Sequence, residues 1–523
     1  MIAAFVYLLV RILILQTGGY EKYQNKVLSQ LTTESSVTAE RGRIYDTNRT
    51  VLATNVTTYR VFVSPRTIRE YSEEDGTRYD EIIANGLSGL LDTTYENVMK
   101  QTTYTRYLDR TIARQVDEQT AAQVEEFIDK YRLNNMVFLQ AGSKRYYPHG
   151  TLACHVLGFT TSDGGGAYGL ELQYDSLLSG TSGRYITARD SHGNEMPYEY
   201  QSYIRASDGH SIVTTLDVYV QSVLEEQLST AYIESGGQSR ACGIVIDVET
   251  GGILGMATYP SFDLNDPRTL NADSQSKLNA SGYAAGTEAY LKLKQELQLT
   301  TWANKSITEA YMPGSTFKIV TASMAYEENL VSAGETFYCP GYFKVGGRTI
   351  HCHKIAGHGS LTFAQGLQQS CNPILMMMGL RIGQERFYNY FRSFGYLEKT
   401  GVDLPGEGVS IFYKPENFKE IDLATASFGQ NFKITPLQQI MAVTTVASGG
   451  YLLTPHLLKE ELDSNGNVVK SYETNVRRQV ISTDTATQLA KILEEGVSGN
   501  GGAKNAYVAG YRVAAKTGTS EKI

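Results

Sequence analysis

The feature that most constrains the fold of this chain is Pro313-Gly-Ser315-Thr-Phe-Lys318, which opens the apolar run 319–325. Pro-Gly ends the preceding segment, and the apolar run predicts a buried helix that begins at Ser315. Positions i and i+3 are neighbours on a helix, so Lys318 follows the Ser315 hydroxyl by one turn. A serine hydroxyl needs an adjacent base to act as a nucleophile, and a buried, neutral lysine can be that base. The N-terminus of the helix also offers free backbone N–H groups for a developing oxyanion.

A second motif, Ser370-Cys-Asn372, ends a helix-like run. This spacing lets a hydroxyl and an amide point into one cleft from a tight turn. Both motifs are short and occur elsewhere. Ser274-Gln-Ser-Lys277 repeats the first in a polar stretch without Pro-Gly, where we predict a solvated loop, and Ser498-Gly-Asn500 repeats the second in a Gly-rich loop.

The third motif, Lys516-Thr517-Gly518-Thr519, follows the strand-like segment 511–515. On a strand, a cation, a hydroxyl and a position without a side chain suit a carboxylate-bearing peptide laid alongside. Lys399-Thr-Gly401 is a second match, but it runs into a Pro-Gly sequence that is typical of a turn.

The three motifs in this order form a set shared by penicillin-binding proteins and class A β-lactamases. Over nearly its whole length the sequence resembles the class B penicillin-binding proteins of the division/sporulation type. The other segments that carry the resemblance are Arg41-Gly-Arg-Ile-Tyr-Asp46, Arg145-Tyr-Tyr-Pro148, Gly169-Leu-Glu171, Met256-Ala-Thr-Tyr-Pro-Ser-Phe-Asp263, Asn304, Phe428-Gly-Gln-Asn431 and Thr435-Pro-Leu-Gln438.

The resemblance implies a membrane-anchored, single-pass serine D,D-transpeptidase that cross-links peptidoglycan stem peptides outside the cytoplasmic membrane. By analogy, Ser315 attacks the acyl-D-Ala-D-Ala carbonyl and Lys318 is the general base. Ser370 relays the proton to the leaving group, Asn372 orients Lys318 and the substrate amide, and Lys516 sets the local electrostatics.

The resemblance also assigns the substrate-binding residues. Thr517, beside Gly518, holds the substrate carboxylate, and the backbone N–H groups of Ser315 and Thr519 form the oxyanion hole. β-Lactams are expected to acylate Ser315. No metal or organic cofactor is implied, and the glycan polymerase is a separate membrane protein of the SEDS type.

The expected fold is α+β, with a β-rich pedestal ahead of an antiparallel sheet flanked by helices. A hydrophobic content of 41% with 20% charged residues fits a folded globular chain. We expect a partial membrane anchor over 1–16 and a non-catalytic pedestal or dimerisation domain over 17–205. A linker and the start of the catalytic domain are expected over 206–235, and the transpeptidase domain over 236–523. Family members continue with further catalytic strands and a longer anchor, so both ends look clipped.

Local patterns predict several elements. A strand is expected over 59–64 and short helices over 70–135, including 112–131. A strand over 209–217 leads into a helix through 226. Segments 241–247 and 252–257 are expected to form a buried hairpin.

The apolar N-terminal segment and the net charge limit the cellular location and the kinds of partner. Residues 1–15 are apolar apart from Arg11, shorter than the roughly 20 residues that span a bilayer. A partial anchor is favoured over a buried N-terminal helix. A formal net charge of −8 argues against a nucleic-acid partner, which would require a basic face.

Cysteines and histidines cluster between 339 and 358. A disulfide between Cys339 and Cys352 across a hairpin is favoured because an oxidising compartment is expected. Two free thiols are the alternative. A zinc site is disfavoured because the spacing from Cys339 to His358 matches no common finger. Cys371 is assigned to packing and His358 to a structural role.

Two other functions stay open. One is a β-lactamase or β-lactam sensor of the same fold, against which the long pedestal and the absence of an evident deacylation Glu argue. The other is a truncated, non-catalytic scaffold that docks a glycan polymerase. Function belongs to the site rather than to the fold.

Overall fold

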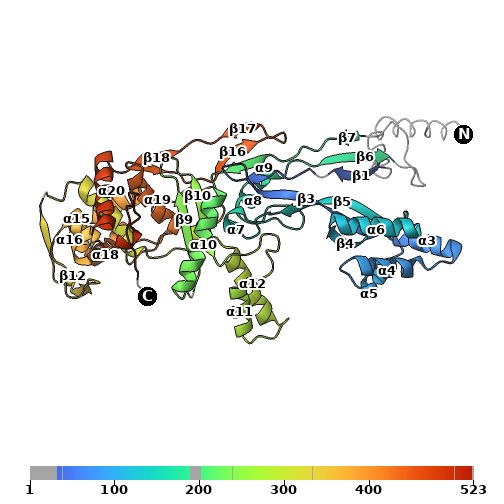
Figure 1. Ribbon diagram of the computed structural model, residues 1–523, viewed down its shortest axis with the longest axis horizontal. Coiled ribbons are helices and arrows are strands. Elements are labelled where there is room, and N and C mark those ends of the chain that lie inside the picture. The colour runs from blue at the N-terminus through green and yellow to red at the C-terminus, as the bar shows by residue number, and fades with distance from the viewer. Residues whose placement is uncertain are drawn as a thin grey trace.

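The computed structural model describes residues 7, 32–37, 39–188, 202–237, 239–332, 334–499 and 501–520. The molecule is elongated, with the N-terminal half at one end and the helices of the C-terminal half at the other (Figure 1). The anchor predicted over 1–16 lies outside the described residues, apart from Tyr7. Among the helices that the structure describes, none is long and apolar enough to cross a membrane.

A seven-stranded sheet of order β17-β16-β8-β2-β3-β4, with β5 also paired to β3, runs along the molecule. Its long strand β3 pairs antiparallel with β5 from Thr54↔Tyr146 to Val63↔Val137. It contains the predicted strand 59–64 except for Ser64, which is the N-cap of α3 (Pro65–Asp75). β16 and β17 come from the C-terminal half, so one sheet ties the two halves together. The strands are β2 (Ile44–Tyr45), β3 (Val51–Val63), β4 (Arg110–Val116), β5 (Val137–Tyr146), β8 (Ser211–Thr214), β16 (Leu458–Leu462) and β17 (Val468–Ser471).

The N-terminal half also contains short helices. The helix predicted over 112–131 is wrong in its first part, because residues 110–116 form β4 and the helix begins only after the Asp117 N-cap. Main-chain pairing with β3 outweighs the local preference of this segment. The helices of the N-terminal half are α3 (Pro65–Asp75), α4 (Tyr79–Leu90), α5 (Tyr95–Thr102), α6 (Glu118–Tyr131), α7 (Cys154–Leu157), α8 (Gly169–Gln173) and α9 (Asp175–Leu178). A separate sheet has the order β1-β6-β7, with β1 (Thr32–Val37), β6 (Gly183–Ala188) and β7 (Ser202–Ile204).

A buried ion cluster joins Arg41, Arg145 and Glu171, which lie in three of the segments that carry the resemblance to the family. Glu171 is fully buried, and its two carboxylate oxygens accept hydrogen bonds from Arg41 Nε at 2.7 Å and Arg145 Nε at 2.6 Å. Arg41 also reaches Asp175 at 2.7 Å. Buried charges in this geometry hold three distant segments in one arrangement.

We expect Glu171→Gln to lower the free energy of unfolding by about 3–5 kcal/mol, because two buried guanidinium groups lose their shared carboxylate. Urea unfolding of the full chain, followed by circular dichroism, measures the change. Glu460→Gln is the matched control, since it removes a more exposed pair with Arg49 at 2.5 Å and should cost about 0–1 kcal/mol. Equal losses in the two variants would contradict a special role for the buried cluster.

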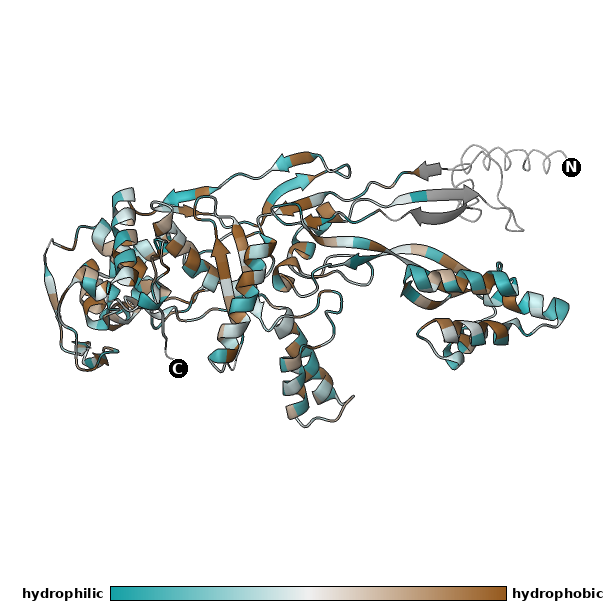
Figure 2. Cartoon of the chain, in the orientation of Figure 1, coloured by the Kyte–Doolittle hydropathy of each residue, from teal (hydrophilic) through white to brown (hydrophobic). Residues whose placement is uncertain are grey.

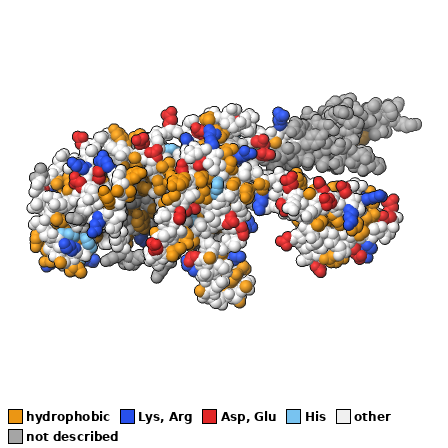
Figure 3. Space-filling model, in the orientation of Figure 1, with side chains coloured by type: hydrophobic (Ala, Val, Ile, Leu, Met, Phe, Trp, Pro, Cys, Tyr) orange, Lys and Arg blue, Asp and Glu red, His pale blue; other side chains and the backbone are white. Residues whose placement is uncertain are grey.

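The C-terminal half is built around buried helices. The predicted hairpin is confirmed as β9 (Ala241–Ile246) and β10 (Ile253–Tyr259), which pair antiparallel. Its apolar residues lie beside α10 (Val218–Glu234), as Figure 2 shows. The strand predicted over 209–217 is shorter, β8 (Ser211–Thr214), and the helix after it runs beyond residue 226. In Figure 3, charges of both signs are interspersed over the visible face.

Helices α14 and α16 are buried in this half, whereas α11 and α12 project from the middle of the molecule (Figure 1). The remaining strands are β11 (Thr336–Cys339), β12 (Tyr342–Val345), β13 (Arg348–His351), β14 (Gly359–Thr362), β15 (Tyr451–Leu453) and β18 (Val476–Gln479). The helices are α11 (Ala272–Ala280), α12 (Glu288–Trp302), α13 (Lys305–Thr308), α14 (Lys318–Glu327), α15 (Phe363–Gln368), α16 (Asn372–Ile382), α17 (Gln384–Ser393), α18 (Glu420–Ala426), α19 (Pro436–Ala447) and α20 (Thr483–Ser498), with single 3₁₀ turns η1 (Gly314–Phe317), η2 (Pro415–Asn417) and η3 (Lys504–Ala506).

Candidate active site

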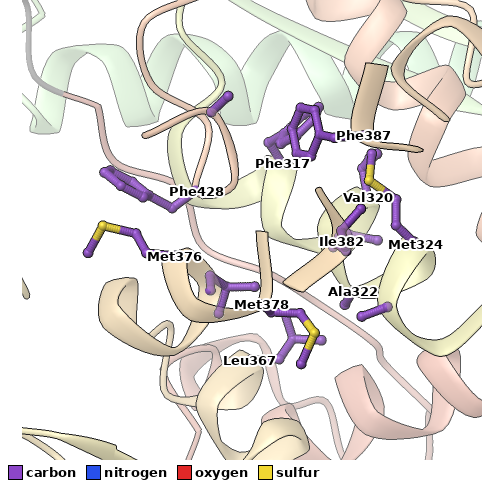
Figure 4. Packing of buried hydrophobic residues seen from close by; sticks show 14 of the residues in the cluster. Phe317, Val320, Ala322, Met324, Leu367, Met376, Met378, Ile382, Phe387 and Phe428 are labelled. Carbon is purple, nitrogen blue, oxygen red and sulfur yellow. The ribbon is translucent and has the colours of Figure 1, made fainter. Parts of the chain in front are cut away.

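The predicted nucleophile stands at the start of a buried helix. Ser315 lies in the 3₁₀ turn η1, and α14 continues directly from it. Phe317, Val320 and Met324 are buried and pack among the apolar residues of neighbouring helices (Figure 4). This packing fixes the helix, so the half-buried Ser315 and the fully buried Lys318 are held at its first turn.

Lys318 connects the first motif to the second. Its Nζ donates to the Ser370 carbonyl oxygen at 2.6 Å, to Ser370 Oγ at 3.1 Å and to Asn372 Oδ1 at 2.7 Å. Lys516 Nζ donates to the same Ser370 Oγ at 2.9 Å. Three segments far apart in the sequence therefore meet around one hydroxyl, with a lysine amino group on either side of it.

The surroundings favour the neutral form of both lysines. Burial first, and the positive charge of Lys516 second, lower the pKa of Lys318 to about 7. Burial lowers the pKa of Lys516 to about 8. A neutral amine at Lys318 is thus accessible near neutral pH, which a general base requires.

The third motif packs against the turn that carries Ser315. A Cβ on Gly518 would lie 2.7 Å from Thr316 Cγ2, and a Cβ on Gly314 would lie 2.3 Å from the Thr519 carbonyl oxygen. Neither glycine leaves room for a side chain. Thr517 and Thr519 are exposed, so the backbone beside Ser315 is open to a ligand.

The strand predicted over 511–515 is wrong, because residues 511–520 have no regular secondary structure. A strand requires main-chain pairing with a neighbour about 4.8 Å away. Here a cavity of about 370 Å³ is lined on one side by Cys242, Gly243 and Ile244 of β9 and on the other by Ala514, Ala515 and Lys516.

The repeated motifs lie elsewhere. Ser274 belongs to α11 rather than to the predicted loop, and its buried hydroxyl pairs with Thr301 Oγ1 at 3.1 Å. Lys277 forms an ion pair with Asp273 at 2.7 Å. Thr400 donates from N and Oγ1 to Glu407, as suits the turn predicted there. Asn500, which completes the second copy of the Ser-x-Asn pattern, lies outside the described residues.

The predicted Cys339–Cys352 disulfide is wrong, since both thiols are free. Each sulfur lies instead 3.6 Å from His358 Nδ1. From the sequence, Cys371 was assigned only to packing, but its sulfur belongs to this group. The ligand atoms of Cys339, Cys352, His358 and Cys371 all lie within 4.8 Å of one another. The signal available in the sequence was Cys371, a third cysteine that lies within the second motif. With Cys339, Cys352 and His358 it makes four possible N/S ligands.

Two family models match the chain. Residues 241–523 match the penicillin binding protein transpeptidase domain, and residues 36–214 match the penicillin-binding protein dimerisation domain. Stage V sporulation protein D of Bacillus subtilis is 33% identical over 92% of this chain and 69% of its own length. Peptidoglycan D,D-transpeptidase FtsI of Escherichia coli is 26% identical over 93% and 74%.

Solved structures share the fold. A peptidoglycan synthetase from Bifidobacterium adolescentis superimposes with a TM-score of 0.69 at 23% identity, covering 94% of this chain and 86% of its own. Penicillin binding protein 3 from Mycobacterium tuberculosis, complexed with ampicillin, superimposes with a TM-score of 0.65 at 24% identity, covering 94% and 82%.

The fold and its two matched domains define a penicillin-binding protein. More particularly, the chain belongs to the class B penicillin-binding proteins, the peptidoglycan D,D-transpeptidases of cell-wall synthesis.

Proposed function

We propose that this chain forms its acyl-enzyme on Ser315 and transfers the acyl group of one peptidoglycan stem peptide to an amine of another. The observation that carries the proposal is the set of contacts around Lys318, whose Nζ lies 2.7 Å from Asn372 Oδ1 and 3.1 Å from Ser370 Oγ. Lys318 is fully buried one turn after Ser315, as an activating base must be.

In the proposed acylation step, Lys318 removes the proton of Ser315 as Oγ attacks the carbonyl carbon before the terminal D-Ala. The C–N bond then breaks, and Ser370 relays a proton to the departing amine of D-Ala. Lys516 supports the relay, because its Nζ donates to Ser370 Oγ at 2.9 Å. An acceptor amine then attacks the ester, loses its proton along the same path and returns Ser315 to its hydroxyl form.

We assign binding of the substrate to the third motif. The backbone N–H groups of Ser315 and Thr519 are the proposed oxyanion hole, which the close approach of Gly314 to the Thr519 carbonyl supports. Thr517 would bind the substrate carboxylate beside Gly518. A β-lactam would acylate Ser315 in the same way, since opening its ring forms the same ester.

The wider assignments are also proposals. We assign residues 17–205 to a pedestal, 206–235 to a linker and the start of the catalytic domain, and 236–523 to the transpeptidase domain. We place the catalytic part outside the cytoplasmic membrane on a single-pass anchor. A SEDS-type glycan polymerase would supply the glycan strands. The resemblance to the family supports these assignments.

The lifetime of the penicillin adduct tests the proposed function. We expect one penicilloyl group per full-length chain by intact mass, persisting for many minutes after excess penicillin is removed. The same protein should release D-Ala from an acyl-D-Ala-D-Ala peptide and join the acyl group to an added amine. Rapid hydrolysis of the adduct would point to a β-lactamase or sensor, and absence of any adduct on folded protein would point to a scaffold.

A further inference from the structure

Four potential metal ligands converge beside the active site. Cys339, Cys352 and Cys371 are almost completely buried, and their sulfur atoms lie with His358 Nδ1 inside a group no wider than 4.8 Å. With Zn–S at about 2.3 Å and Zn–N at about 2.0–2.1 Å, the S···N edge of a zinc tetrahedron is about 3.6 Å. Two such edges, from Cys339 and Cys352 to His358, measure 3.6 Å.

The backbone around these ligands is tightly built. Cys352 N donates to the Gly341 carbonyl at 2.8 Å, and His358 N donates to the Cys339 carbonyl at 3.1 Å. Gly341 and Gly357 both have positive φ, and a Cβ on either would lie within 2.4 Å of a carbonyl oxygen. The two ligand-bearing turns therefore cross with no room for side chains, which fixes the spacing of their ligands.

We propose that Cys339, Cys352, His358 and Cys371 bind one Zn²⁺ ion. The donor set of three sulfurs and one imidazole nitrogen is that of a structural zinc site, in which four protein ligands leave no open position. The neighbouring His353 is exposed and does not belong to the four residues whose ligand atoms all lie within 4.8 Å of one another. Binding would release the three thiol protons.

The proposed metal site is linked to the proposed catalytic residues through Cys371. Cys371 lies between Ser370 and Asn372, the two residues that receive hydrogen bonds from Lys318. Ser370 has φ = 54°, a conformation that a non-glycine residue keeps only where surrounding contacts enforce it. A metal on Cys371 would anchor this turn, which makes Cys371 a positioning residue. This coupling rests on the proposed function, whereas occupancy by zinc does not.

Metal content tests the occupancy. Full-length protein purified without chelator, then analysed by inductively coupled plasma mass spectrometry, should contain about one zinc per chain. Exchange with Co²⁺ should give thiolate-to-cobalt charge-transfer absorption. Cys371→Ser and His358→Ala should lose most of the metal, whereas Cys242→Ser, at a free cysteine outside the group, should retain it. A metal-free wild type in which all five cysteines alkylate, or one with a Cys339–Cys352 bridge, would overturn the proposal.

Chelation tests the coupling. Removal of zinc should lower the second-order rate of acylation by penicillin by about 10- to 100-fold, because small displacements of catalytic groups cost this much. Zinc should restore the rate, while far-ultraviolet circular dichroism stays unchanged. An unchanged rate in the metal-free protein would overturn the positioning role. If zinc is present but no adduct forms, the proposed function fails and the metal site stands. If the wild type is zinc-free as purified and binds no added zinc, yet forms an adduct, the metal site fails and the proposed function stands.

Discussion

Ser315→Ala is expected to abolish the penicilloyl adduct on this chain. The substitution removes the only atom that can form the ester and leaves the packing of η1 nearly unchanged, because Ser315 Oγ makes no hydrogen bond within the described residues. Intact mass of the full chain after exposure to a fluorescent penicillin measures the adduct. The expected change is from one adduct per chain to none, with binding contacts otherwise retained.

The sequence offers a matched control for this variant. Ser274→Ala alters the other Ser-x-x-Lys motif, which lies in α11 and whose serine hydroxyl pairs with Thr301 of α12. Its adduct should match that of the wild type in yield and rate. An adduct that survives in Ser315→Ala, or is lost in Ser274→Ala, would place the nucleophile elsewhere.

Local patterns predicted the elements whose periodicity and pairing agree. The hairpin β9–β10 is one, because the short turn at Glu249-Thr-Gly251 favours pairing of the two apolar runs with each other. The buried helix that follows the first motif is another, because the apolar run specifies its burial. Its predicted start at Ser315 is occupied by the 3₁₀ turn η1, and α14 begins at Lys318. The α+β class followed from the mixture of these patterns.

Long-range pairing explains the errors. Residues 112–116 became part of β4 because β3 pairs with them, and 511–515 stayed irregular because a cavity separates 514–516 from β9. The residues near a segment in the sequence do not determine which strand lies beside it in the folded structure. Propensity alone therefore misjudged both.

The site could be predicted in its members but not in its geometry. Motif order brought Ser315, Lys318, Ser370, Asn372 and Lys516 to notice, and all of these except Ser315 prove to be linked by hydrogen bonds. The fourth member of the cysteine cluster was missed because Cys371 lies 19 residues beyond Cys352 in the sequence, on the other side of β14 and α15. Only the fold brings those sulfurs together.

The rate of acylation should depend on pH as a bell, with apparent pKa values of about 7 and about 8. Below pH 7 Lys318 is protonated and cannot accept the Ser315 proton, so the rate should fall about tenfold per pH unit. Above pH 8 Lys516 loses the charge that supports the relay through Ser370, and the rate should fall again. Stopped-flow measurement of the second-order rate of acylation between pH 5 and 10 checks the profile.

Substitutions assign the two limbs. Lys318→Met should lower the rate by about 10²- to 10⁴-fold and abolish the acidic limb, because the base itself is gone. Lys277→Met, in the other Ser-x-x-Lys motif, is the matched control and should leave the profile unchanged. Lys516→Met should abolish the alkaline limb and move the acidic limb to higher pH, since the charge of Lys516 helps to depress the pKa of Lys318. The two lysines interact, so each limb reports on the pair rather than on an isolated residue. An acidic limb that persists in Lys318→Met would assign the base to another group and remove the central element of the proposed mechanism.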